Sequence, residues 1–340
     1  MKYCNREEII MKKVFAMALS VVLCIGMMTG CGSKDDSSDN NSSDATKVYN
    51  IGICQLVEHP ALDAATQGFQ DALTELLGDN VKFDFQNAQG EQTNATTICN
   101  AFVADKVDLI LANATSPLQA AASATADIPI LGTSITDYAT ALDMSDWAGV
   151  TGRNISGTSD LAPLDQQEKM LLELCPDVTK VGIVYCSAEA NSAYQARVFG
   201  GYLEADGIAY QEYTAADSNE IQTVITNAIQ DCDVIYIPTD NTMASNTEII
   251  NNVCLPAGIP VIAGEEGICK GCGIATLSIS YYDLGYATGK MAYEILVNGA
   301  DVSAMEVQYA PNVTKEYNAA NCEALQISVP EEYVAIEVEE

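Results

Sequence analysis

The chain is short of basic and aromatic residues. Its 340 residues include one histidine, one tryptophan and 15 lysines and arginines, against 47 aspartates and glutamates. Nucleic acid and anionic lipid both require a basic face, so a formal net charge of −32 argues against either as a partner. A single histidine and a single C-x-x-C pair likewise argue against a structural zinc site. We expect no metal and no cofactor, and a ligand that is zwitterionic or cationic rather than strongly anionic.

The N-terminal apolar run is too short to span a membrane. VFAMALSVVLCIGMM falls below the ~20 residues that a spanning helix needs, follows Met11-Lys-Lys and leads to Thr29-Gly30-Cys31. A charged start, an apolar stretch and a small-residue cleavage site form a secretory signal. Two small residues before a cysteine also resemble the lipobox of bacterial lipoproteins, which implies acylation of Cys31. We expect residues 1–30 to be removed, with Met11 as the true start.

The segment after Cys31 is polar. SKDDSSDNNSSDAT, residues 33–46, has alanine as its only apolar residue, so it cannot bury enough surface to offset its own ordering. We interpret 31–46 as a lipidated, disordered tether whose reach is roughly 20–25 Å, at ~5–6 Å × √n. The sequence therefore predicts an extracytoplasmic protein held at the membrane by its lipid anchor only.

Nine cysteines remain after the predicted signal and the lipidated residue are set aside. Because nine is odd, they cannot all be paired. Most lie within apolar runs such as IGIC and IVYC, where cysteine behaves as a small buried hydrophobe, so we expect buried thiols. Cys269-Lys-Gly-Cys272 is the exception and leaves a redox pair or a local disulfide open.

From Lys47 onward, short β-branched runs alternate with helical patterns. Such alternation indicates βαβ units with buried parallel sheets. We predict strands at 48–54, 81–85, 107–112, 128–131, 180–186, 208–213, 233–238, 259–264 and 273–279. We predict helices at 61–77, 92–105, 117–125, 163–175, 191–206, 218–230, 241–256 and 282–298.

The strand series ends near residue 132 and restarts at Lys180, which indicates two lobes. About 310 residues after the signal also exceed what one core usually accommodates. We predict an α/β protein of two doubly wound parallel-sheet lobes. The expected parts are 47–157 with about 280–300 for the first lobe, 158–279 with about 301–330 for the second, and an acidic tail at 331–340.

Polar residues follow five of the predicted strands. In open parallel sheets a ligand sits beyond the carboxyl ends of the strands, so these loops are where a site is expected. Proline at a first helical turn, as at Pro60 and Pro117, indicates a helix start whose free N–H groups attract a carboxylate. Acidic residues in the same loops suit an ammonium group. Together these groups would hold the zwitterion of an amino acid.

Eight segments carry a family resemblance. EHPALDAATQGFQDAL, FQNAQGEQTNATTI, ATSPLQAAA, TSDLAP, SAEANS, YIPTDNTMAS, PVIAGEEG and SYYDLGYATGKMA resemble, in this order, substrate-binding lipoproteins of ABC importers of the tryptophan and aromatic amino acid type. The resemblance covers nearly all of residues 47–310. It implies a type I periplasmic-binding-protein fold, with a three-crossover hinge and a cleft between the lobes.

The resemblance also implies a set of ligand contacts. Carried over by position, these are Glu58, Leu62, Thr115, Ser116, Asp137, Asp160, Glu189, Asn191, Ser192, Asp240, Asn241 and Glu265. An aromatic ligand also requires apolar walls and a stacking ring. The candidate rings are Tyr138, Tyr185, Tyr281 and Tyr282, with Leu56, Val57 and Leu62 at the rim. We interpret the lone His59 as a helix-start residue, because no nucleophile forms a recognisable constellation with it.

The predicted function is capture without chemistry. A monomeric chain would bind tryptophan, phenylalanine or tyrosine by closure of two lobes and then dock on an ABC permease driven by an ATPase. Two alternatives remain open at this stage. One is the same fold serving a sugar, a nucleoside or another small amine, and the other is a redox lipoprotein that uses Cys269 and Cys272.

Overall fold

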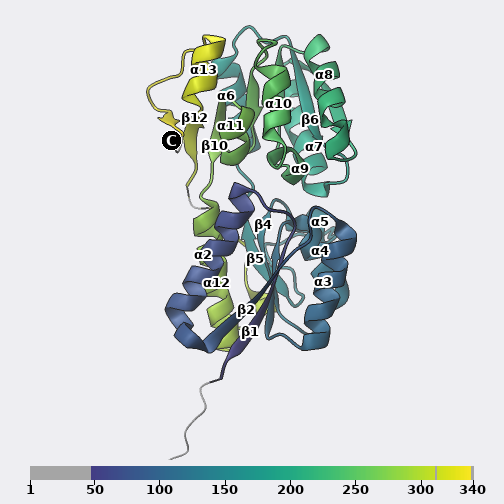
Figure 1. Ribbon diagram of the computed structural model, residues 1–340, viewed down its shortest axis with the longest axis vertical. Helices are drawn as coiled ribbons and strands as arrows, with labels where there is room; N and C mark the ends of the chain where they lie inside the picture. The colour runs from purple at the N-terminus through teal and green to yellow at the C-terminus, as the bar shows by residue number, and fades with distance from the viewer. Residues whose placement is uncertain (1–46, 311, 338–340) are drawn as a thin grey trace, which may run out of the picture. The chain divides into compact units, whose positions relative to one another are not determined.

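The computed structural model describes residues 47–310 and 312–337. It contains two sheets with helices on both faces, which confirms the predicted α/β fold class of two doubly wound lobes (Figure 1). The predicted signal at 1–30, the lipidation site Cys31 and the tether at 31–46 lie outside the described residues. Within the described part, every helix is too short or too polar to cross a membrane.

The first sheet has six strands in the order β11-β5-β4-β3-β1-β2, and neighbouring strands are all parallel. Its strands are β1 (Tyr49–Gln55), β2 (Val81–Asn87), β3 (Leu109–Asn113), β4 (Ile130–Ile135), β5 (Ile155–Ser159) and β11 (Gln308–Tyr309).

The second sheet has seven strands in the order β13-β12-β10-β9-β8-β6-β7. Neighbouring strands are parallel except β10 and β12, so β12 and β13 run opposite to the other five. Its strands are β6 (Lys180–Cys186), β7 (Ala209–Ala215), β8 (Val234–Ile237), β9 (Val261–Ala263), β10 (Ala275–Ser278), β12 (Thr314–Tyr317) and β13 (Val334–Ala335).

The helices follow the strands in βα alternation. The first sheet carries α2 (Pro60–Leu77), α3 (Gln92–Asp105), α4 (Thr115–Ala124), α5 (Tyr138–Ala141) and α12 (Tyr281–Leu296). The second carries α6 (Leu164–Leu174), α7 (Ala190–Ala205), α8 (Ile221–Asp231), α9 (Asn241–Ala244), α10 (Thr247–Cys254), α11 (Glu266–Cys272) and α13 (Ala319–Leu325). Short 3-10 turns lie at Gly78–Asn80, Ser218–Glu220 and Val302–Ala304.

The inner strands of the first sheet, β1, β3, β4 and β5, bury side chains on both faces. Successive side chains of a strand point to opposite sides, so Ile53 and Leu111 pack with Phe69 of α2 on one face. Cys54 and Ala112 pack on the other face, beneath α3 and α4. Full burial of one such large apolar side chain stabilises the fold by ~1.5–3 kcal/mol. This two-sided burial explains why the strands read as continuous apolar runs.

The second sheet is built in the same way. Ile183 packs on one face with Phe199 of α7, and Val184 packs on the other with Ile225 of α8. The phenyl ring of Phe199 is stacked on the ring of Tyr236, with ring centroids 3.6 Å apart. The two lobes therefore have separate cores, and each is a βα unit series that folds around its own sheet.

Helices α2 and α12 pack unusually closely along the first sheet. A Cβ atom added to Gly68 would overlap the backbone of Tyr282, and one added to Gly285 would overlap the backbone of Ala65. The side chains that would separate the two helices are absent at these crossing points. This contact matters for the site, because α12 begins where the chain returns from the second lobe to the first.

The chain crosses between the sheets three times, after β5, after β10 and after β11. These three crossovers agree with the predicted hinge. Because the crossovers lie at the carboxyl ends of β5 and β10, they stand beside the loops in which the site was expected.

Several strands were missed in the sequence. β5 has the sequence ISGTS, whose glycine, serines and threonine are weak indicators of a strand, yet all five residues are buried between β4 and β11. The predicted helix 241–256 is divided into α9 and α10, and α11 was not predicted. Tertiary position, rather than local composition, decides these short elements.

The C-terminal assignments need two corrections. Residues 301–330 were expected in the second lobe, but β11 pairs with β5 of the first sheet. The segment 331–340 was predicted as an acidic tail, but Tyr333 and Ile336 are buried and β13 pairs with β12. The apolar run YVAI, which acidic residues flank, contains this edge strand, and the acidic composition concealed it.

Candidate functional site

A small cavity lies where the carboxyl ends of the two sheets face each other. It receives residues that follow β1, β5, β6, β8 and β9, which are the positions expected for a ligand in an open α/β sheet. We call these residues the interlobe site: His59, Leu62, Ser134, Thr136, Asp160, Asn191, Thr239, Asp240, Asn241, Ala244, Glu265 and Tyr281. Six of the twelve predicted contacts are among them: Leu62, Asp160, Asn191, Asp240, Asn241 and Glu265.

His59 connects the lobes. It is the residue before the first turn of α2, as predicted, but its side chain makes no capping hydrogen bond. Instead, Nε2 lies 3.1 Å from Oδ1 of Asn241 in the second lobe. Pro60 supplies the helix start and needs no cap for its missing N–H, so the imidazole remains available for this contact.

Glu189 holds the α9 loop from behind the interlobe site. Its carboxylate accepts hydrogen bonds from the backbone N–H groups of Asn241 at 3.0 Å and Thr242 at 2.8 Å, and from both of their side chains. Four charge-assisted bonds to one carboxylate fix the orientation of Asn241. Glu189 was predicted as a ligand contact, and in this structure all of these bonds are made to the protein.

Asp240 is a buried cap. It accepts from the backbone N–H groups of Met243 at 2.8 Å and Cys186 at 2.7 Å, and it joins the start of α9 to the end of β6. Burial, and then the negative charge of Glu189, raise the pKa of Asp240, while hydrogen bonds from Cys186, Met243 and Ser192 oppose that shift. Ser192 is thus placed behind the site, next to Asp240.

Asp160 stands at the first crossover and has one oxygen without a partner. Its side chain belongs to a residue that is only 3% exposed, and Oδ2 accepts a hydrogen bond from the Tyr281 hydroxyl at 2.9 Å. Oδ1 is buried and has no hydrogen-bond partner in the described part of the chain. Burial raises the pKa of Asp160, whereas the hydrogen bond from Tyr281 and the charge of His59 oppose the shift.

Ser134 has a second unpartnered polar atom at the same cavity. Its Oγ is buried without a hydrogen-bond partner among the described residues, and its backbone φ of 56° lies in the left-handed region that favours glycine. The residue sits where the register between β4 and β5 shifts. The loop after the predicted strand 128–131 was not among the five polar loops singled out in the sequence, so neither Ser134 nor Thr136 was predicted.

Glu265 caps α11 and also lines the interlobe site. It accepts from the backbone N–H groups of Ile268 and of Gly267, the latter at 2.7 Å. Burial raises the pKa of Glu265, and the charge of His59 and these backbone bonds oppose the shift. The capping role and the position in the cavity coexist, because a carboxylate accepts about four hydrogen bonds.

Four predicted contacts lie elsewhere. Glu58 is exposed, Thr115 and Ser116 begin α4, and Asp137 caps α5 by accepting from the Thr140 N–H at 2.7 Å. None of the four lines the interlobe site in this structure.

Of the four candidate rings, only Tyr281 lies at the interlobe site. Tyr138 is in the core of the first lobe, where its hydroxyl donates to the Gly132 and Thr158 carbonyls. Tyr185 is in the core of the second lobe and donates to Glu212, and Tyr282 is 40% exposed. Periodicity identifies these tyrosines as helix or strand residues but cannot tell which side of the sheet each ring faces.

The nine described cysteines are all buried and unpaired, as predicted for most of them, and this includes Cys269 and Cys272, which the sequence left open. Burial raises the pKa of Cys269 and of Cys272 well above the ordinary thiol value. A redox pair requires the opposite shift, because the thiolate is the reactive species. The burial of both thiols therefore does not favour the redox alternative.

The interlobe site suits an ammonium group but has little space. Three carboxylates face it, the sole imidazole is on its rim, and the described residues contain no cluster of three metal-ligating side chains. Its volume is about 10 Å³, far below the ~300–1,000 Å³ of typical ligand pockets. An organic ligand would fit this site only if the lobes moved apart, which would open the contact between His59 and Asn241.

Comparison with known proteins identifies related chains. The family model described as ABC transporter substrate binding protein matches residues 50–339. A protein named "Tyrosine-binding protein" from Clostridioides difficile (strain R20291) is 38% identical over 291 residues, which cover 84% of each chain.

Two solved structures differ in how closely they superpose. An ABC domain from Streptococcus pneumonia in complex with L-Trp is 33% identical with a TM-score of 0.80, covering 84% of this chain and 97% of that one. A ligand-free, open structure of a substrate-binding protein with adhesive properties from Clostridium difficile is 37% identical with a TM-score of 0.66, covering 86% of this chain and all of that one. The more identical relative is thus the less similar in overall arrangement.

Proposed function

Because the chain belongs to the ABC transporter substrate-binding protein family, we propose that it captures an aromatic L-amino acid between its two lobes. The ligand class is supported by the relative named for tyrosine binding and by the solved structure that contains L-Trp. The interlobe site is the proposed place of binding.

The observation that carries this proposal is the pair of unpartnered polar atoms in one cavity. Six buried side-chain polar atoms of the described residues have no hydrogen-bond partner, and two of them, Asp160 Oδ1 and Ser134 Oγ, line the interlobe site. An unsatisfied buried polar group costs ~1–3 kcal/mol. Asp160 would accept from the ligand ammonium, and the Ser134 hydroxyl would donate to the ligand carboxylate.

The remaining proposed contacts come from both lobes. His59, Leu62 and Tyr281 would approach the ligand from the first lobe, and Asn191, Asp240, Asn241 and Glu265 from the second. A ligand shifts an opening equilibrium only by its differential affinity, so contact with both lobes is what couples binding to closure. The higher TM-score to the L-Trp complex than to the open relative supports a closed arrangement of the lobes here.

The wider context follows from the family and from the N-terminal sequence. We place the protein outside the cytoplasm, tethered through a lipid on Cys31, and we propose that it delivers its ligand to an ABC permease and its ATPase. It performs no chemistry on the ligand. The closed, loaded form is the one that would dock.

Isothermal titration with tyrosine, tryptophan and phenylalanine tests the proposal. We expect at least one to bind with a dissociation constant below about 1 mM. Asp160→Asn should weaken binding at least tenfold, whereas Glu58→Gln, a matched acid-to-amide change at an exposed position, should not. Absence of binding across all twenty amino acids would refute an amino-acid ligand.

A further inference from the structure

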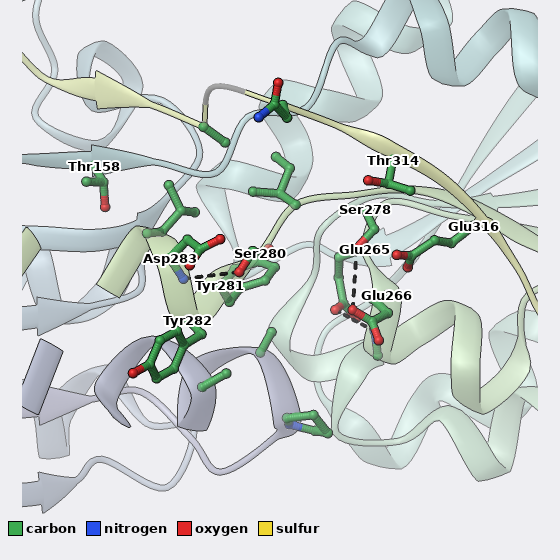
Figure 2. Close-up of a pocket in the computed structure, with 18 of the residues that line it drawn as sticks. Thr158, Glu265, Glu266, Ser278, Ser280, Tyr281, Tyr282, Asp283, Thr314 and Glu316 are labelled. Atoms are coloured by element: carbon green, nitrogen blue, oxygen red, sulfur yellow. Dashed lines mark hydrogen bonds between the residues drawn. The ribbon is translucent and has the colours of Figure 1, made fainter. Parts of the chain in front are cut away.

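A much larger cavity lies on the crossover side of the molecule. It has a volume of about 960 Å³, within the range of small-molecule pockets, and it meets the interlobe site only at Glu265 and Tyr281. We call it the hinge-side cavity. It is bounded by the starts of α2 and α12 and by residues of α11, β10, β12 and the last two crossovers (Figure 2).

The walls of the hinge-side cavity combine apolar surface with acid. Ile279, Tyr281 and Leu284 provide apolar walls, and Glu266 and Glu316 bring two carboxylates. Lys270 is the only basic residue in the lining, and it forms no salt bridge within the described part of the chain. The excess of acid over base in this cavity favours a cationic occupant over an anionic one.

The carboxylates of Glu266 and Glu316 repel each other. Figure 2 shows Glu266, Ser278 and Glu316 grouped at one end of the cavity, where the Ser278 hydroxyl is 3.4 Å from Glu266 Oε2. Glu316 Oε2 is buried and has no hydrogen-bond partner among the described residues. Burial, and then the charge of Glu266, raise the pKa of Glu316. A positive charge between them would remove the repulsion and satisfy the buried oxygen.

The occupant can be narrowed by what the cavity lacks. The described residues hold no cluster of three metal-ligating side chains, so two carboxylates and a hydroxyl do not form a cation cage. An ammonium group supplies three N–H donors for these acceptors, and an apolar body would lie along Ile279 and Leu284. The chemistry therefore matches an organic ammonium ion.

We propose that the hinge-side cavity is a second binding site, which takes an organic ammonium ion with an apolar body and couples its occupancy to closure of the lobes. Its walls belong to both lobes, with Pro60 and Leu284 from the first and Glu266 and Glu316 from the second. A ligand held there stabilises the arrangement in which the His59 and Asn241 side chains meet. By linkage, an occupant of the hinge-side cavity raises the affinity of the interlobe site for the amino acid by a certain factor. The amino acid raises the affinity of the hinge-side cavity for its occupant by the same factor. The coupling, unlike the binding, rests on the proposed function.

The test uses n-hexylammonium chloride as the probe and n-hexanol as its uncharged counterpart. Titration calorimetry should show saturable binding of hexylammonium and none of hexanol. Glu316→Gln should weaken hexylammonium binding at least tenfold, and Ala287→Leu should also weaken it by filling the cavity from α12. Glu306→Gln, at an exposed acid outside the cavity, is the matched control and should bind like the parent.

A second titration separates this cavity from the interlobe site. Saturation with tyrosine should strengthen hexylammonium binding, and Asp160→Asn should leave hexylammonium binding intact. No binding of hexylammonium, or binding that ignores Glu316→Gln and Ala287→Leu but disappears with Asp160→Asn, would overturn the proposal. Glu316-dependent binding in a protein that binds no amino acid would uphold the cavity while refuting the proposed function.

Discussion

The imidazole Nε2 of His59 lies 3.1 Å from Oδ1 of Asn241 and joins the start of α2 in the first lobe to the start of α9 in the second. Both residues line the interlobe site. The contact is held from behind by Glu189, which binds the Asn241 backbone and side chain. Glu189 therefore fixes the position of the residue through which α9 meets the first lobe.

His59→Ala should shift the ligand-free protein toward an open arrangement. The substitution removes the side chain that reaches Asn241, so the closed form loses a contact while the open form loses nothing. Small-angle X-ray scattering should show a larger radius of gyration for the variant, reversed by saturating ligand. Glu58→Ala, at the exposed neighbouring residue, should scatter like the parent. An unchanged radius for His59→Ala would mean that this contact does not hold the lobes together.

Asp160→Asn should stabilise the ligand-free protein at neutral pH while impairing binding. Burial raises the pKa of Asp160 in the folded state, so folding favours its protonated form. That contribution is fully present below the unfolded pKa of about 3.9 and is lost as pH rises through the folded pKa. The melting temperature of Asp160→Asn relative to the parent should accordingly increase from pH 4 to pH 7.5. A difference that stays constant over this range would contradict the assignment.

Two substitutions of Ser134 separate the effect of backbone strain from that of ligand binding. Left-handed backbone costs a residue with a Cβ roughly 1–2 kcal/mol. Glycine removes this cost, but its greater entropy in the unfolded state cancels part of the gain. Ser134→Gly should stabilise the protein by about 0.5–1 kcal/mol in urea unfolding. Ser134→Ala keeps the strain and should not. Both should weaken ligand binding, since both remove the hydroxyl. If binding survives in both, the hydroxyl does not contact the ligand.

Gly285→Ala should be strongly destabilising. The added methyl group would overlap the Ala65 backbone at the contact between α2 and α12, and helix backbones cannot yield as a flexible side chain can. We expect a loss of at least about 1–3 kcal/mol, as for other overpacked positions. Gly201→Ala in α7 meets no atom within 4 Å and should stabilise by up to about 1 kcal/mol. Chemical denaturation of both variants would measure these opposite signs.

The Cys269→Ala/Cys272→Ala double variant tests the redox alternative. Both thiols lie on the buried side of α11 in the core of the second lobe, so their removal should lower stability through lost packing but leave ligand affinity within about twofold. Titration calorimetry and thermal melts measure the two effects separately. A complete loss of ligand binding in a variant that still melts cooperatively would indicate a functional role for the pair.

The lobes and their strand series could be predicted, because a strand buried on both faces requires a continuous apolar run. IGIC and LILA are such continuous apolar runs, and both lie in the core of the first lobe. The polar strand β5 could not be predicted, because its burial comes from neighbours on either side rather than from its own residues.

The site was predicted in part for a related reason. Asp240 and Glu265 follow predicted strands, and the carboxyl ends of parallel strands meet at one edge. Asp160 follows β5, which was not predicted, so this residue came only from the family resemblance. Thr115 follows a strand as well, but in this structure it lies outside the interlobe site at the start of α4. Sequence order tells which loops share an edge, but not how far each loop extends across the cleft.

What the sequence by itself determined is the class of fold, the family and a negative charge that disfavours anionic partners. The fold class and the charge follow from local composition and periodicity, and the family follows from the motifs that carry the resemblance. Each segment carries these features alone. Only the tertiary structure decided that Ser134 and Asp160 leave unpartnered atoms in one cavity and that Glu266 and Glu316 lie at one end of another. Both results depend on which hydrogen-bond partners the folded neighbours supply, and that is a property of residues distant in the chain.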